Sequence, residues 1–178
     1  MQYLAPDALE RAKRVRLVIF DVDGVLTDGR LWYGPDGEEL KAFHAFDGHG
    51  VHLLRMASLD TAILSGRKSQ AVEERAKELG IRHVVQGAAN KLAAFQRMVR
   101  RLKVKPATVA YMGDDVVDLP VLTRCGFACA PHEAPEDVRG RVHYIASADA
   151  GHGAAREVCE YILEAQGKLG RVMRRYLT

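Results

Sequence analysis

Five aspartates directly follow apolar segments of this chain, which suggests a shared site for a metal ion and for catalysis. They are Asp21 and Asp23 after residues 17–20, and Asp114, Asp115 and Asp118 after residues 109–112. In an open parallel sheet, groups that follow the strands collect at one edge. Two bare unit charges roughly 4 Å apart repel by about 4 kcal/mol in a protein-like dielectric, so we expect a divalent cation among these carboxylates. Oxygen ligands without Cys or His favour Mg²⁺ over zinc.

Polar residues at the ends of other segments suit a phosphate ester. Ser65 and Gly66 follow residues 61–64 and supply a hydroxyl and an approachable backbone N–H, and Lys91 begins a helical segment. A metal, a lysine and N–H donors position and neutralise a phosphoryl group during transfer. Arg67 either contacts the substrate or lies solvated in a first turn, and its place beside Ser65 favours contact.

The spacing of Asp21 and Asp23 suggests hydrolysis in two steps. We expect Asp21 to be the nucleophile and to form an aspartyl-phosphate. Asp23, two residues on, returns to the site through the turn, where it protonates the leaving oxygen and then deprotonates the attacking water. Asp115 supports the metal from outside its ligand shell or caps the helix that follows, with equal weight for both.

Alternating strands and helices must position these residues. We expect strands at residues 17–20, 61–64, 83–85, 109–112, 127–130 and, more weakly, 142–145, and helices at 51–57, 70–79, 91–102, 115–123, 135–138 and 153–165. A short opening helix is expected after Pro6, with Leu9 and Ala12 on one face. This alternation requires crossover connections, and it predicts an α/β fold with a mostly parallel sheet between two layers of helices.

One segment, at about residues 29–46, departs from the alternation and is expected to form an inserted β-hairpin. It carries 4 of the 12 aromatic residues of the chain, namely Trp32, Tyr33, Phe43 and Phe46. A small hairpin cannot bury four rings within itself. The rings therefore fold onto their own domain or contact another subunit.

Length and charge exclude several classes of protein. A chain of 178 residues fits a single domain (1–178) that needs no disulfide, and three cysteines without a CxxC pair suggest core residues. A net charge of +3, from 26 basic and 23 acidic residues, is too even for a dedicated nucleic-acid or membrane-surface binder. Because neither a membrane-spanning run nor a signal peptide is recognisable, a cytoplasmic location is expected.

Several other polar residues have a structural interpretation that competes with a functional one. Asp28 precedes a glycine and is expected to form a turn rather than to assist the site. His44, His49 and His52 lack the pattern of a metal cluster and are expected to pack on the surface or hairpin. The basic tail, residues 168–178, is expected to be a disordered end.

Four ordered motifs resemble those of the haloacid dehalogenase superfamily: DVDGVLTDG from Asp21, LSGR ending at Arg67, Lys91, and GDDVVDLP from Gly113. Longer stretches between about residues 14 and 170 resemble its 3-deoxy-D-manno-octulosonate 8-phosphate (KDO 8-phosphate) phosphatases. The resemblance implies a Rossmann-like fold without a large cap domain, a homotetramer joined by its hairpins, and a tail that can reach a neighbour's site. It also implies that Asp21, Asp114 and the carbonyl of Asp23 hold Mg²⁺, that Ser65 and Lys91 bind phosphate, and that Asp118 supports the lysine or the metal shell.

Two positions depart from this family. Phe46 and His152 stand where the family usually has cations, in V-R-D-G and in G-G-R-G or G-G-K-G. The resemblance implies a phosphoric monoester hydrolase that releases orthophosphate from KDO 8-phosphate in the cytoplasm, for lipopolysaccharide synthesis. The departures keep a second substrate open, a nine-carbon sialic-acid-like sugar phosphate. A non-catalytic oligomerisation module is a third reading, which the intact Asp21, Asp23, Lys91 and Asp114 oppose.

Overall fold

One seven-stranded sheet runs through the chain, of which a computed structural model describes residues 3–177. Its strands are β1 (Tyr3–Leu4), β2 (Leu17–Phe20), β5 (Asp60–Leu64), β6 (His83–Val85), β7 (Val109–Met112), β8 (Phe127–Ala130) and β9 (Tyr144–Ile145). Their order across the sheet is β1-β9-β8-β7-β2-β5-β6, and only β1 pairs antiparallel among these strands. The expected parallel sheet is confirmed, with β1 added at its edge.

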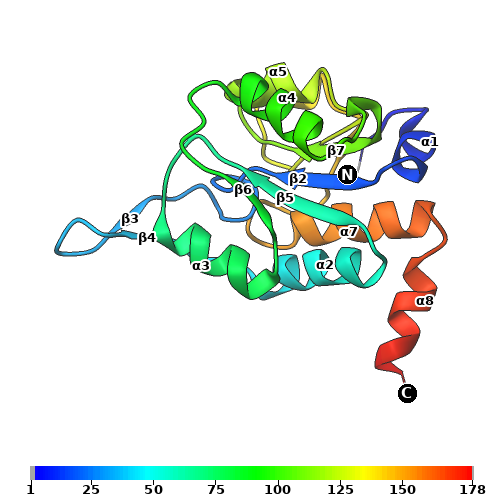
Figure 1. The fold of residues 1–178 in the computed structure, drawn as a ribbon, viewed down its shortest axis with the longest axis horizontal. Coiled ribbons are helices and arrows are strands. Elements are labelled where there is room, and N and C mark those ends of the chain that lie inside the picture. The colour runs from blue at the N-terminus through cyan, green and yellow to red at the C-terminus, as the bar shows by residue number, and fades with distance from the viewer. Residues whose placement is uncertain (1–2, 178) are drawn as a thin grey trace.

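Helices cover both faces of the sheet and complete the expected three layers (Figure 1). One face packs against α1 (Ala8–Lys13), α2 (Ala45–Met56), α3 (Gln70–Leu79) and α7 (Ala154–Ala165). The other packs against α4 (Lys91–Arg101), α5 (Leu119–Leu122) and α6 (Glu136–Arg139). Short 3₁₀ helices η1 (Pro106–Thr108) and η2 (Val116–Asp118) flank β7, and α8 (Leu169–Met173) and η3 (Arg174–Tyr176) follow α7.

The central strand β2 explains why the strands are unbroken apolar runs. Val18 and Phe20 belong to the core beneath α2 and α7, whereas Leu17 and Ile19 belong to the core beneath α4. All four are fully buried. Successive side chains of a strand point to opposite faces, so a strand covered on both sides needs an apolar residue at every position. Asp21 is the first polar residue beyond this core.

The inserted hairpin consists of β3 (Trp32–Tyr33) and β4 (Glu39–Leu40), which project from the body of the molecule (Figure 1). It is shorter than predicted, because its pairing ends at Leu40 and helix α2 already begins at Ala45. The expected end at Phe46 is therefore wrong. His44 caps the helix, since its Nδ1 accepts a hydrogen bond from the Phe46 N–H at 3.1 Å.

Helices α2 and α7 cross closely, and this contact explains two features of α2. A Cβ on Gly50 would lie 2.9 Å from Cα of Arg156, so a glycine is needed there. Asp47 is buried, and its carboxylate accepts hydrogen bonds from the backbone N–H groups of Gly153 at 3.2 Å and Arg156 at 2.9 Å. It thereby satisfies donors at the amino end of α7 that have no partner within that helix.

Both ends of the chain differ from expectation. In α1 the residues that face the core are Ala8 and Ala12, whereas Leu9 is 48% exposed. The tail was expected to be disordered, but α8 and η3 form there, because Val172 is buried against the core. Beyond α8, the Tyr176 hydroxyl donates to Sδ of Met56 at 3.4 Å. Residue 178, the last of the tail, lies outside the described residues.

The three cysteines are buried core residues, as expected. Cys129 and Cys159 lie in the core on the α2 and α7 face, and Cys125 lies in the core on the opposite face. Burial raises the pKa of the Cys125 thiol to about 12 and raises those of the other two well above their usual value. Among residues 3–177, no helix combines the length and the apolar character that crossing a bilayer requires.

Candidate active site

A cleft of about 260 Å³ opens at the carboxyl edge of the sheet, where β7, β2 and β5 lie side by side. It is lined by Asp21, Asp23, Gly24, Gly29, Ser65, Gly66, Arg67, Lys91, Asp114, Asp115 and Val117. The fold therefore gathers the residues expected to act together, as open α/β sheets do where neighbouring connections diverge. Of the site residues expected from sequence, Asp118 alone lies beneath the lining, fully buried.

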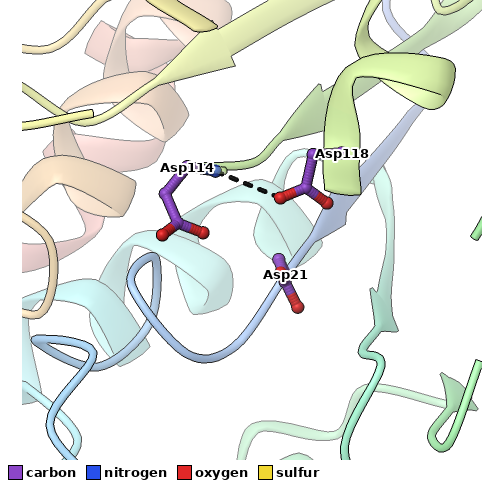
Figure 2. Close-up of side chains that lie close together, drawn as sticks. All are labelled: Asp21, Asp114 and Asp118. Atoms are coloured by element: carbon purple, nitrogen blue, oxygen red, sulfur yellow. Dashed lines mark hydrogen bonds between the residues drawn. The ribbon is translucent and has the colours of Figure 1, made fainter. Parts of the chain in front are cut away.

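Three carboxylates lie close together at the base of the cleft. Asp21 stands at the end of β2, and Asp114 and Asp118 lie in the segment after β7 (Figure 2). One oxygen from each lies within 4.8 Å of the others. Within the described chain this is the one cluster of acidic, His or Cys side chains with such spacing, and His44, His49 and His52 are not part of it.

Asp118 is already saturated with protein hydrogen bonds. Its Oδ1 accepts from Lys91 Nζ at 2.6 Å and from the Tyr111 hydroxyl at 2.5 Å, and its Oδ2 accepts from the backbone N–H groups of Asp114 and Asp115 at 3.3 Å. Asp115 also caps η2, with its side chain accepting from Val116 N–H at 2.7 Å. The capping interpretation of Asp115 is confirmed.

Lys91 is the cation nearest to this cluster. Its side chain is 6% exposed and is ion-paired with both Asp21 and Asp118. Burial by itself lowers the pKa of the Lys91 ammonium, but attraction to these two carboxylates outweighs burial and raises it. Lys91 is held at the start of α4, where Asn90 caps the helix by accepting from Ala93 N–H at 2.9 Å.

One lysine does not balance three carboxylates, of which Asp21 and Asp118 are buried and Asp114 is half-buried. Burial, with repulsion from Asp118, raises the pKa of Asp21 to about 6 against the opposing attraction of Lys91. Burial, with repulsion from Asp21 and Asp118, raises the pKa of Asp114 to about 8. Both shifts show that the carboxylates repel one another more strongly than one lysine offsets.

The arrangement fits a divalent cation with oxygen ligands. No described residue donates a hydrogen bond to the Asp114 carboxylate, so both of its oxygens remain available. Gly24 leaves room for it, because a Cβ there would lie 2.1 Å from Asp114 Oδ2 and the residue adopts φ +74°. Asp21 and Asp114 could thus hold an ion of the Mg²⁺ type, with Asp118 orienting Lys91.

The segment after β5 borders the cleft with groups suited to an anion. Ser65 is buried, and its Oγ accepts from the Arg67 N–H at 3.3 Å. A Cβ on Gly66 would lie 3.9 Å from Cε of Lys91, so the backbone here approaches the lysine closely. Ser65, Gly66 and Lys91 therefore border one space, as their positions in the sequence predicted.

Asp23 is held by residues of the hairpin that sequence reasoning missed. Lys41, just after β4, is ion-paired with Oδ1 of Asp23 and lies 2.6 Å from Oε1 of Glu39. Arg67 reaches the same group, donating to Oε2 of Glu39 at 2.5 Å and to the Tyr33 hydroxyl at 3.2 Å. The available signal was the spacing of Glu39 and Lys41, which places opposite charges on one side of an extended segment.

Comparison with known proteins agrees with this geometry. The profile of the haloacid dehalogenase-like hydrolases matches residues 36–126. The 3-deoxy-D-manno-octulosonate 8-phosphate phosphatase KdsC of Yersinia pestis is 43% identical over 166 residues, which cover 93% of this chain and 89% of that protein. This chain belongs to the KDO 8-phosphate phosphatase family of the haloacid dehalogenase superfamily.

Solved structures of this phosphatase family share the fold closely. A crystal structure of the Yersinia pestis phosphatase superposes with a TM-score of 0.90 at 43% identity, covering 93% of this chain and 89% of that one. The phosphatase of Moraxella catarrhalis, crystallised with magnesium, phosphate and KDO, superposes with a TM-score of 0.93 at 38% identity, covering 96% and 98%.

The two departures from the KDO 8-phosphate phosphatase pattern lie on one patch. The His44 ring lies 5.0 Å from the Phe46 ring and 6.2 Å from the His152 ring, between centroids. Phe46 is 65% exposed, and neither Phe46 nor His152 is among the described residues that line the cleft.

Asp28, as expected, forms a turn, in which its Oδ1 accepts a hydrogen bond from the Arg30 N–H at 3.0 Å.

Proposed function

We propose that this chain is a Mg²⁺-dependent phosphatase that hydrolyses KDO 8-phosphate to KDO and orthophosphate. The observation that carries the proposal is the cluster of Asp21, Asp114 and Asp118 beside Lys91, in a chain 43% identical to a KDO 8-phosphate phosphatase. The Moraxella catarrhalis relative, crystallised with magnesium, phosphate and KDO, supports both the cofactor and the substrate.

The first step transfers the phosphoryl group to the protein. A carboxylate oxygen of Asp21 attacks phosphorus while the bond from phosphorus to the sugar oxygen breaks. Protonated Asp23 gives its proton to that leaving oxygen. Ser65, the backbone at Gly66 and Lys91 orient the phosphoryl oxygens and balance their charge. The products of this step are KDO and an aspartyl-phosphate on Asp21.

The second step regenerates the enzyme. Asp23, now ionised, removes a proton from a water molecule as that water attacks phosphorus, and the bond from phosphorus to Asp21 breaks. Orthophosphate leaves, and Asp23 is again protonated for the next cycle. When bound, Mg²⁺ supplies positive charge that favours attack by one anion on another. Asp21, Asp114 and the backbone carbonyl of Asp23 are the groups proposed to hold it.

Assembly and cellular role form a further part of the proposal. We infer a homotetramer joined through the hairpin, because Trp32, Tyr33 and Leu40 are more than half exposed there and apolar patches of this kind mark contacts between proteins. The reaction is assigned to the cytoplasm, as a step that supplies lipopolysaccharide synthesis. The 43% identity to a KDO 8-phosphate phosphatase supports the reaction on which this assignment rests.

Orthophosphate release from a panel of substrates tests the proposed reaction. The panel holds KDO 8-phosphate, a nine-carbon sialic-acid-like 9-phosphate and a neutral sugar phosphate, each with Mg²⁺ and with excess chelator. We expect the highest kcat/KM with KDO 8-phosphate and loss of turnover with chelator. A higher kcat/KM for the nine-carbon substrate would replace the proposed substrate, and absence of release from all three would refute a phosphatase.

A further inference from the structure

Lys41 occupies an unusual position for a lysine. Its side chain is only 1% exposed, although it directly follows β4 of the short hairpin. It is enclosed by two carboxylates, Asp23 and Glu39. Burial by itself lowers the pKa of the Lys41 ammonium, but its close contacts with the carboxylates of Asp23 and Glu39 outweigh this and raise it. A buried lysine charge needs such partners.

Glu39 organises the charged groups around Asp23. One of its oxygens lies 2.6 Å from Nζ of Lys41, and the other accepts from Arg67 at 2.5 Å. The Arg67 guanidinium is thereby kept 3.8 Å from Oδ2 of Asp23, outside hydrogen-bond distance. Lys41 donates to Oδ1 of Asp23. Within the described chain, Oδ1 is thus engaged while Oδ2 accepts no hydrogen bond.

This asymmetry determines where Asp23 can carry a proton. An ammonium group has three donors and no acceptor, so the oxygen that faces Lys41 must remain an acceptor. A proton on Oδ1 would place the carboxyl O–H donor of Asp23 against an N–H donor of Lys41. The acid form of Asp23 therefore carries its proton on Oδ2, and Asp23 lines the cleft.

We propose that Lys41, itself held by Glu39, is a positioning residue for phosphoryl transfer, which orients Asp23 and keeps Oδ2 as the oxygen that delivers the proton. The proposal rests on the proposed phosphatase function. In the transfer step the bond from Oδ2 to hydrogen breaks, the leaving oxygen gains that hydrogen, and phosphorus passes from the leaving oxygen to Asp21. The hairpin thus helps to position the general acid of its own chain.

A role in proton delivery predicts a dependence on the leaving group. A sugar alkoxide is a poor leaving group and needs the proton, phenolate needs it less, and p-nitrophenolate departs well without it. General acid catalysis contributes about 10²–10⁴-fold to a rate, so misplacing the acid removes part of this factor. The loss should decrease from KDO 8-phosphate to phenyl phosphate to p-nitrophenyl phosphate.

The experiment measures kcat and KM for these three substrates at saturating Mg²⁺, in the full-length protein. For Lys41→Met we expect kcat/KM to fall about 10- to 100-fold with KDO 8-phosphate, less with phenyl phosphate, and about threefold or less with p-nitrophenyl phosphate. Asp23→Asn should show the same order with larger losses. Lys41→Arg, which keeps a cationic donor, should recover most of the wild-type values.

Lys77→Met is the matched control, because Lys77 pairs with Glu74 on the surface of α3 and should leave all three substrates unchanged. The ratio kcat/KM covers substrate binding and departure of the leaving group, and it excludes hydrolysis of the common aspartyl-phosphate. If Lys41 only contacted the sugar, KM for KDO 8-phosphate would rise while the two aryl phosphates kept their wild-type values. That result would overturn the proposal.

Two further outcomes separate the hypotheses. Equal losses of kcat/KM with all three substrates in a folded Lys41→Met protein would refute the role of Lys41 and leave the phosphatase function standing. A wild-type protein inactive toward all three would overturn both.

If Lys41→Met does not fold, Glu39→Gln is the deciding variant, because it removes the carboxylate that holds Lys41. The same order of losses would support the proposal, and any other order would refute it.

Discussion

At the scale of single residues, the main feature of the site is an excess of negative charge. Asp21, Asp114 and Asp118 lie close together at the base of the cleft, and one lysine pairs with two of them. Sequence order alone predicted that the aspartates and Lys91 would meet, because each follows a strand or begins a helix. It did not predict that Lys41 binds Asp23 or that Tyr111 binds Asp118, because those contacts depend on how a short hairpin folds back and on which side of β7 faces α4.

Asp21→Asn and Asp23→Asn should separate the two carboxylate roles. We expect Asp21→Asn to abolish turnover, because an amide neither attacks phosphorus nor ligates a metal well. Asp23→Asn should slow both formation and hydrolysis of the aspartyl-phosphate, by about 10²-fold or more. Phosphate release and rapid-quench kinetics measure these effects, and circular dichroism checks the fold. Substantial activity in Asp21→Asn would eliminate the covalent route.

Metal binding should depend on pH through Asp114 and Asp21. Both pKa values are raised in the metal-free protein, to about 8 and about 6, by burial and neighbouring carboxylates. The folded state therefore holds protons that the unfolded chain has lost, and its stability falls as pH rises from about 4 to about 8. Because Mg²⁺ displaces these protons, we expect it to raise Tm more at pH 8 than at pH 6.

Thermal melting with Mg²⁺ and with chelator, at both pH values, measures this effect. Asp114→Asn should remove most of the difference, since its amide has no proton to lose in this range. An increase in Tm with Mg²⁺ that is the same at pH 6 and pH 8 would contradict the charge argument.

At the scale of elements, most strands and helices could be predicted and their junctions could not. The strands 17–20, 109–112 and 127–130 coincide with expectation, because a parallel strand buried on both faces has no other sequence pattern. The start of α2 was missed because Gly48 and Gly50 disfavour a helix. The glycine at position 50 is explained by tertiary packing, because it allows the close approach of α7.

Asp47→Ala should destabilise the fold through α7. The change leaves the half-buried N–H groups of Gly153 and Arg156 without their acceptor, which costs about 1–3 kcal/mol. Urea denaturation measures it, with an unchanged m value expected. Asp137→Ala is the control, because Asp137 pairs with Arg141 at the surface and such pairs contribute about 1 kcal/mol at most. Equal effects of the two changes would show that Asp47 is no cap.

At the scale of the whole molecule, the hairpin is a small projection with an apolar side. Trp32 and Leu40 are cross-strand neighbours, and both are 54% exposed. Phe43 behaves differently, since it packs against the core with the Arg75 guanidinium 5.8 Å from its ring centre. The rings of this segment were expected either to pack on their own domain or to contact another subunit, and each alternative fits different residues. Phe43 packs on its own domain, and Trp32 and Tyr33 remain available to a partner.

Replacing the exposed pair should dissociate the proposed tetramer. We expect Trp32→Asp combined with Leu40→Asp to yield monomers at micromolar concentration, because two charges cannot enter an apolar interface without a large desolvation cost. Light scattering measures the mass. Leu9→Asp, at an exposed leucine of α1, should leave the assembly unchanged. A wild-type protein that is already monomeric would refute the assembly.

The burial of the three cysteines on both faces of the sheet has a practical consequence. Each thiol is shielded from reagents in the folded protein, so its rate of alkylation reports how often the surrounding layer opens. Cys125 reports on the layer that contains α4, and Cys159 reports on the layer of α2 and α7. Equal protection of both sites would mean that the sheet loses its two coverings in a single event, whereas unequal protection would identify the layer that separates first.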